Sequence, residues 1–388
     1  GVGDRPAWAR LLPEYLKPFA YRSYHVGKWH LDGTPLQNGF DRSYLNMNEL
    51  GYFRAVNHQL DEVDLPEVEA DGKFYSTLTT VDYAIRFLEE HGEKHADQPF
   101  FAYIAFNSPH FPVQALPQDI AVYKDRYRVG WDVIREERLG RLRESGIVDS
   151  GLSRLDPDIV PRRNLAEREL REQVDRREVA HAVPWQSLTR DEKEFQAQKM
   201  AVHAAMVHRI DLEVGRIVQQ LEKMGAVEDT LIFFLSDNGA SAEQIVRRGL
   251  HRPGADVGSP ESYLGIGPGW SSAANTPFRL HKSWVHEGGI ATPLIVHWPA
   301  AIKGSGELRT SPAHLVDLLP TVQELVGDGL RPGKDVLRAP PFPGVSLLPE
   351  FASDGALQRE YLWWDHDGNR AIRAGNWKLV ALQSAGWE

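Results

Sequence analysis

The sequence predicts an α/β fold with a mostly parallel sheet and helices on both faces of it. Two amphipathic stretches, at residues 78–90 and 199–224, read as helices because their apolar residues recur every three or four positions. Four near-continuous apolar runs have the length and the aromatic or β-branched content of buried strands: residues 21–26, 99–106, 230–236 and 293–298. Such alternation of strands and helices is typical of an open parallel sheet.

The segment between the two predicted helices differs in composition from its surroundings. Residues 117–194 are dense in Arg, Glu and Asp and contain few apolar runs. This pattern favours a solvated, charged helical insertion, and a lid that shapes the substrate pocket is the alternative. The second helix is followed by Gly225, a residue type that commonly ends helices.

The sequence also predicts how the chain is divided into domains. Residues 1–330 form the predicted α/β catalytic domain, and the Pro-rich residues 331–349 form a connector. Strand-like runs at 360–364 and 377–382 predict that residues 350–388 begin a small antiparallel C-terminal subdomain.

Composition excludes several classes of protein. The 388 residues are 42% hydrophobic and 25% charged, which is typical of a soluble globular protein. A net charge of -10 argues against a nucleic-acid partner, which requires a clustered basic surface. No run is long enough for a membrane span, and no signal peptide is recognisable. The absence of cysteine excludes disulfides, thiolate metal sites and a cysteine nucleophile within these residues.

Four polar clusters accompany the predicted strands. They are Gly-Lys-Trp-His at 27–30, Ser-Pro-His at 108–110, Asp-Asn-Gly at 237–239, and Lys282 shortly before Glu-Gly-Gly at 287–289. Three of them follow a strand directly, and ligands of open α/β sheets bind beyond the carboxyl ends of strands. Lysines, histidines and hard oxygens together suit a metal-assisted attack on a tetrahedral anionic ester.

Each cluster also has a structural explanation when it is taken alone. Asp237 and Asn238 offer hard oxygens that suit Ca²⁺ or Mg²⁺ better than zinc, yet Asp-Asn-Gly also favours an Asx turn. Lys28 or Lys282 could hold an oxyanion or be a surface lysine. His110 could be a general acid or a loop histidine. The combination and its order carry more information than any single cluster.

That order resembles the sulfatase family, in the alkaline-phosphatase-like superfamily, and is similar to its bacterial arylsulfatase-like branch. The supporting motifs are Gly-Lys-Trp-His, Ser-Pro-His, Asp-Asn-Gly-Ala and His-Lys-Ser-Trp-Val-His-Glu-Gly-Gly, and the resemblance runs from about residue 21 to the end. It implies hydrolysis of organic sulfate esters, a Ca²⁺ ion in preference to Mg²⁺, and a location in the periplasm or outside the cell.

The resemblance also implies a role for each motif residue. Asp237 and Asn238 would be Ca²⁺ ligands. Lys28 and Lys282 would bind sulfate oxygens. His110 would lie beside the leaving-group oxygen together with Lys282 and help to protonate it. In the first cluster, His30 would contact the formylglycine nucleophile.

The chain departs from the family pattern at the nucleophile. The family oxidises a Cys or Ser in Cys/Ser-x-Pro-x-Arg to formylglycine, upstream of the Gly-Lys-Trp-His motif, and has paired metal-binding Asp residues further upstream. Neither motif is present. Residues 275–279, Asn-Thr-Pro-Phe-Arg, imitate the first by coincidence. We therefore expect a chain truncated at Gly1 and also at its C-terminus. Such a fragment would lack the first strand, be inactive alone, and be poorly soluble because a sheet edge is exposed.

Two alternatives to a sulfate ester hydrolase stay open. One is a phosphonate monoester or phosphodiester hydrolase, because these enzymes share the superfamily architecture. The other is a non-catalytic relative that binds sulfated ligands, which the missing nucleophile would fit. The expected partner is a small-molecule or glycan sulfate ester, and aryl, carbohydrate and alkyl sulfates all stay open.

Overall fold

The computed structural model describes residue 6 and residues 9–245, 247, 249–327, 343–383 and 385–388. Its contacts divide the chain into two compact units that are each assembled from several segments. The first unit contains residues 1–107, 210–232 and 297–358, and the second contains 108–209, 233–296 and 359–388. Both units bury aromatic side chains, so each has a core of its own.

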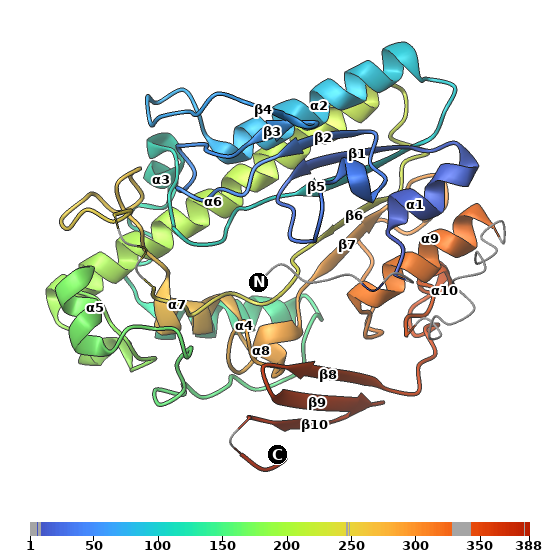
Figure 1. Cartoon of the computed structure of the whole chain (residues 1–388). Coiled ribbons are helices and arrows are strands. Elements are labelled where there is room, and N and C mark those ends of the chain that lie inside the picture. The colour runs from blue at the N-terminus through green and yellow to red at the C-terminus, as the bar shows by residue number, and fades with distance from the viewer. Residues whose placement is uncertain (1–5, 7–8, 246, 248, 328–342, 384) are drawn as a thin grey trace. The chain divides into compact units, whose positions relative to one another are not determined.

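A mixed five-stranded sheet forms the centre of the first unit (Figure 1). Strand β1, next to the edge strand β5, pairs in parallel with β5 on one side and with β2 on the other, and β3 and β4 extend the sheet as antiparallel strands. The runs predicted at 21–26 and 99–106 are thus confirmed as strands. The bounds are β1 (Arg22–Gly27), β2 (Arg42–Leu45), β3 (Gln59–Leu60), β4 (Val63–Asp64) and β5 (Phe100–Ala105).

Helix α2 (Ser76–Lys94) packs on the parallel strands of this sheet. Its apolar face contributes Phe87, fully buried against Tyr24 of β1 and Tyr44 of β2. Burying a side chain of that size contributes about 1.5–3 kcal/mol. The helix predicted at 78–90 is confirmed, and it begins and ends a few residues beyond the predicted bounds.

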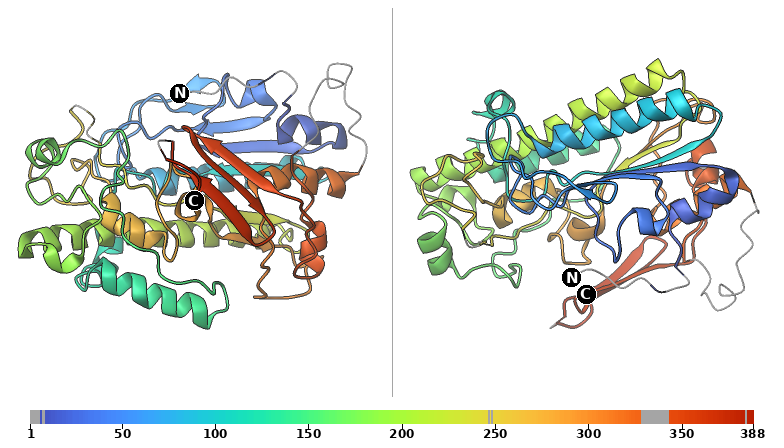
Figure 2. Two further views of the ribbon diagram at one scale, coloured as in Figure 1. Left: turned by 90° about the horizontal axis from the view of Figure 1, so that it is seen from below. Right: turned by 45° about the horizontal axis from the view of Figure 1, so that its top comes forward.

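The other helices of the first unit are short, except for the second half of α6 (Arg190–Lys223). From Ile210 onward that helix runs alongside α2 (Figure 2), and Arg216 pairs with Asp82 of α2 at 2.6 Å. Short helices complete the unit: α1 (Leu12–Leu16), α9 (Leu318–Val326) and α10 (Leu348–Ala352).

The second unit contains the first half of α6, and this helix begins nine residues before the predicted residue 199. The reason is a reciprocal cap, in which the Glu192 amide donates to Thr189 Oγ1 (3.3 Å) and the Thr189 amide to the Glu192 carboxylate (2.8 Å). The remaining helices are α3 (Pro117–Tyr123), α4 (Trp131–Glu144), α5 (Glu167–Gln173), α7 (Gly267–Ala274) and α8 (Glu287–Ile290).

Strands β6 (Ile232–Leu235) and β7 (Leu294–His297) confirm the runs predicted at 230–236 and 293–298. They pair with each other in a two-stranded sheet, separate from the five-stranded one. Phe234 and Ile295 are exposed. Among the described residues, these two strands are therefore not buried on both faces as their apolar composition predicted.

A tryptophan cluster anchors the charged segment 117–194 to the rest of the second unit. Trp131 of α4 lies edge-on to Trp185 and to Trp270 of α7, with ring centroids 4.7 and 5.5 Å apart, and all three are buried. The Trp131 indole also donates to the Val183 carbonyl at 2.9 Å. The segment thus contributes to a core and does not only form a solvated surface.

A three-stranded antiparallel sheet ends the chain, and its strand order is β10–β9–β8. The strand-like runs at 360–364 and 377–382 become β8 (Leu362–His366) and β10 (Trp377–Ala381), while β9 (Asn369–Ala374) was not predicted. Asp367 and Gly368 both have positive φ, as a tight hairpin turn requires. The Asp-Gly dipeptide is the sequence signal that could have predicted a hairpin here, and with it the strand β9.

Two other expectations concern the connector and the domain boundaries. Residues 331–342 of the predicted Pro-rich connector 331–349 lie outside the described residues. The division into a domain at 1–330 and a subdomain at 350–388 stays a prediction. No helix in the described part of the chain combines the length and the apolar character needed to cross a bilayer.

Candidate active site

The loop after β6 holds the predicted metal ligands, and backbone contacts fix its path. The amide of Gly239 donates to the Gly289 carbonyl at 2.9 Å. A Cβ on Gly239 would lie 1.9 Å from the Gly288 carbonyl oxygen, so no side chain fits there. The Asp-Asn-Gly and Glu-Gly-Gly motifs, fifty residues apart in sequence, are therefore parts of one interlocked structure.

Asp237 and Asn238 present their oxygens from this loop. Asp237 is exposed, and within the described part of the chain its carboxylate has no hydrogen-bond or ion-pair partner. The Asn238 amide nitrogen donates to the Gly239 carbonyl at 2.9 Å, which leaves its oxygen available. Two hard oxygens of this kind fit Ca²⁺, whose shell of six to eight oxygens needs further ligands. No cluster of three His, Asp or Glu side chains suited to a metal occurs among the described residues.

The loop that carries Lys282 is built against the metal-ligand loop. The Lys282 amide donates to the Ala240 carbonyl at 3.1 Å, and the Gly288 amide donates to the Arg279 carbonyl at 2.9 Å. A Cβ on Gly288 would lie 2.1 Å from the Leu280 carbonyl oxygen. The absence of a side chain at Gly288 thus lets the chain fold back tightly against the segment that leads to Lys282.

The structure brings Lys282 and His110 into direct contact although 172 residues separate them. Lys282 Nζ lies 3.2 Å from His110 Nε2, and His110 Nδ1 lies 2.8 Å from the Phe111 carbonyl oxygen. Because a carbonyl only accepts, Nδ1 carries the ring hydrogen, and Nε2 accepts from the lysine ammonium. The contact therefore holds the Lys282 side chain against the ring of His110.

Lys28 and His30 lie in the first unit, after the end of β1. Gly27 has a φ of +101°, and a Cβ there would lie 2.1 Å from the Ala105 carbonyl oxygen. Lys28 is half-buried and His30 is exposed. The Lys28 amide donates to the Ala105 carbonyl at 2.9 Å, which ties the start of this loop to the end of β5.

The buried His25 supports the Lys28 loop. Its Nε2 donates to the Lys28 carbonyl at 3.1 Å, and its Nδ1 lies 2.9 Å from the Ser43 hydroxyl. Burial lowers the pKa of His25 to about 4, so the ring stays neutral at physiological pH. It is a structural residue behind Lys28.

Sequence reasoning missed Asn275, the first residue of the Asn-Thr-Pro-Phe-Arg segment that resembles the formylglycine motif. Its buried side-chain amide contacts the backbone of Ala240 and the Leu280 carbonyl. The neighbouring His281 is also buried, and burial lowers its pKa to about 4. No local pattern signals these roles, because the partners of Asn275 lie on two separate loops.

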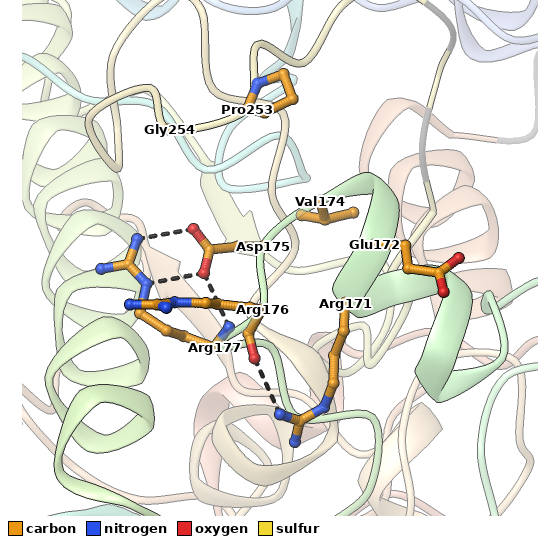
Figure 3. A pocket seen from close by; sticks show the side chains of 8 residues that line it. All are labelled: Arg171, Glu172, Val174, Asp175, Arg176, Arg177, Pro253 and Gly254. Carbon is orange, nitrogen blue, oxygen red and sulfur yellow. Dashed lines mark hydrogen bonds and ion pairs between the residues drawn. The ribbon is translucent and has the colours of Figure 1, made fainter.

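A separate cavity of about 370 Å³ lies on the charged segment (Figure 3). Its arginines are largely neutralised by neighbouring carboxylates: Arg177 pairs with Asp175 at 2.7 Å, and Arg171 with Glu192 at 2.8 Å. Arg176 is the exposed guanidinium at this cavity. The charge balance gives the cavity little attraction for an anion.

The sequence was compared with known families and proteins. Residues 2–328 match the family model described as sulfatase. An uncharacterized sulfatase of Schizosaccharomyces pombe is 30% identical over 433 residues, an alignment that covers 100% of this chain and 71% of that protein. An arylsulfatase of Klebsiella aerogenes is 27% identical, with 87% of this chain and 72% of that protein covered.

A solved structure shows the same fold. It is a protein in complex with its substrate D-glucosamine-2-N,6-O-disulfate, with a TM-score of 0.60 and 19% identity. The match covers 97% of this chain and 74% of that one.

Proposed function

The chain belongs to the sulfatase family, and from that membership we propose that the protein hydrolyses organic sulfate esters. Relatives in the family are sulfuric ester hydrolases. The observation that carries the proposal is the contact between Lys282 and His110, in a loop that is interlocked with the Asp-Asn-Gly loop. A binding module has no need to pair a lysine with a neutral histidine in this way.

The pair suits the chemistry of the leaving group. When the bond between sulfur and the bridging oxygen breaks, negative charge develops on that oxygen. A preorganised ammonium stabilises this charge, and Lys282 is held by His110 before any substrate arrives. Lys282 Nζ is the proton donor to the leaving oxygen in this proposal. His110 keeps the ammonium oriented and accepts one of its hydrogens throughout.

The remaining residues take the roles that the family implies. Asp237 and Asn238 would hold Ca²⁺, which supplies positive charge to the sulfate oxygens. Lys28 binds a sulfate oxygen, and His30 contacts the nucleophile. Formylglycine would supply the nucleophilic oxygen of the reaction. No Cys or Ser in a Cys/Ser-x-Pro-x-Arg context occurs in the sequence, so we place that residue outside these 388.

The substrate class and the location belong to the same proposal. A sulfated sugar is one candidate, because a protein of the same fold was solved with D-glucosamine-2-N,6-O-disulfate as its substrate. Periplasmic or secreted enzymes meet such esters, and we place this protein there.

Turnover of two chromogenic esters by the full-length protein tests the function. It should hydrolyse 4-nitrophenyl sulfate in preference to 4-nitrophenyl phenylphosphonate, and chelation of Ca²⁺ should slow the reaction. Lys282→Ala should lower kcat about 10²–10³-fold, as loss of a preorganised charge does. Arg176→Ala is the matched control, because this exposed cation lies outside the proposed site and should leave kcat unchanged.

Two outcomes would redirect the proposal. Preference for the phosphonate ester would make the protein a phosphonate monoester or phosphodiester hydrolase. Binding of sulfated ligands without turnover of either ester, in a protein shown by mass spectrometry to carry formylglycine, would make it a non-catalytic binder.

A further inference from the structure

We propose that Asn275 is a positioning residue that couples the loop of Asp237 and Asn238 to the loop of Lys282. The significance of the coupling for catalysis rests on the proposed function, whereas the coupling itself rests on contacts within the second unit. Asn275 caps the C-terminus of α7, and the residue is 8% exposed. It touches neither substrate nor metal in this proposal and acts through backbone groups.

One side-chain amide satisfies three backbone groups from two loops. Asn275 Oδ1 accepts from the Ala240 amide at 2.7 Å. Its Nδ2 donates to the Ala240 carbonyl and to the Leu280 carbonyl, each at 3.2 Å. Ala240 follows Asn238 by two residues, and Leu280 precedes Lys282 by two. A primary amide has the required acceptor and two donors in one rigid plane.

Ser271, one helical turn before Asn275, reinforces the same junction. Its hydroxyl donates to the Ala240 carbonyl at 2.9 Å, so its oxygen accepts from His281 Nδ1 at 2.8 Å. The Ala240 carbonyl also accepts the Lys282 amide at 3.1 Å. Ser271 of α7 and the C-cap residue Asn275 thus both donate to the Ala240 carbonyl. The same carbonyl links the loop of the proposed metal ligands to the backbone of the proposed proton donor, Lys282.

Asn275 and the Lys282 amide are linked indirectly, through hydrogen bonds to the same residue, Ala240. Asn275 makes no contact with the Lys282 amide, yet both bind Ala240. Loss of the Asn275 side chain should therefore release the Lys282 amide as well as the Ala240 amide. Second-layer groups of this kind typically change metal affinity by about 10–100-fold.

Hydrogen exchange of the full-length protein, resolved to single amides by mass spectrometry, tests the coupling without metal or substrate. In Asn275→Ala, the amides of Ala240 and Lys282 should both exchange about tenfold faster than in the parent. Asn275→Asp keeps the volume and the acceptor of the Ala240 amide but loses both donors, so it should speed exchange at Lys282 more than at Ala240. Ser272→Ala is the control, because its buried hydroxyl bonds within α7, to the Pro268 carbonyl at 2.8 Å.

Several results would overturn the proposal. Faster exchange at Ala240 with an unchanged Lys282 amide would show that the loops are not coupled. Equal effects of Asn275→Ala and Ser272→Ala would reduce Asn275 to an ordinary buried polar residue.

Calorimetric titration with Ca²⁺ separates this proposal from the proposed function. Asn275→Ala should bind Ca²⁺ about tenfold more weakly than Ser272→Ala. Equal affinities would count against any effect of Asn275 on the metal ligands. A full-length protein whose unaltered form binds no Ca²⁺ would count against the proposed metal site, while the exchange result would still decide the coupling.

Discussion

Replacing Lys199 with methionine should destabilise the second unit by about 3–5 kcal/mol, because it leaves the Glu178 carboxylate buried without a cation. The Lys199 side chain is fully buried and that of Glu178 is 1% exposed. Their two contacts, from Nζ to the two carboxylate oxygens, measure 2.9 and 2.7 Å. At this depth, water cannot replace the lost ammonium.

The surrounding hydrogen bonds determine what the matching substitution should be. Gln196 and Gln244 donate to one oxygen of Glu178, at 3.1 and 3.0 Å. Glu178→Gln keeps an amide oxygen for these donors but leaves the Lys199 ammonium unpaired, so it should also cost about 3–5 kcal/mol. The double variant buries neither charge and should cost only about 1–3 kcal/mol, the range for imperfectly satisfied polar groups.

Urea unfolding followed by tryptophan fluorescence measures these free energies. Trp270 reports on the network directly, because its indole donates to the Gln196 carbonyl at 2.7 Å. The refuting result is additivity: a double variant as unstable as the sum of the two single variants would show that the pair does not act as a unit. A cost below about 1 kcal/mol for Lys199→Met would likewise contradict the buried-charge argument.

Three further predictions concern steric fit, pH and the surface. Gly288→Ala should disrupt the Lys282 loop, because the new Cβ would lie 2.1 Å from the Leu280 carbonyl oxygen; faster proteolysis of that loop would show it, and an unchanged digestion pattern would contradict it. Burial holds the pKa of His25 and His281 at about 4 when folded, against 6.5 when unfolded, so the unfolded chain alone gains protons as pH falls. Stability should therefore fall between pH 6.5 and 4, by roughly 3 kcal/mol per histidine, and a urea midpoint that stays constant over this range would refute the reasoning. Trp377→Ser should change stability by less than about 0.5 kcal/mol but reduce self-association in sedimentation experiments, because Trp377 is 85% exposed; unchanged association would contradict it.

Apolar runs along the chain located β1, β5, β6 and β7, because a strand's composition can be read from neighbours in sequence. Strands β2, β3 and β4 carry no such run, and β6 and β7 are not buried on both faces. The runs did not predict how the strands divide among sheets. The run that became β6 resembles the run that became β5, yet the two lie in different sheets. Pairing depends on which other strand is available in space, and composition does not encode that choice.

The order of the polar motifs was by itself enough to predict the family, which the family match confirms. The roles that it implied for Lys282, His110, Asp237 and Asn238 stay predictions. Only tertiary structure showed that Lys282 Nζ lies 3.2 Å from His110 Nε2, the contact from which we propose their roles. It also showed the contacts of Asn275 with two loops, from which we propose its positioning role. Residue types and their order persist along the chain and can be read from it. Proton positions and hydrogen-bond partners are set by groups that are distant in sequence, and only the folded chain brings these groups within about 3 Å of one another.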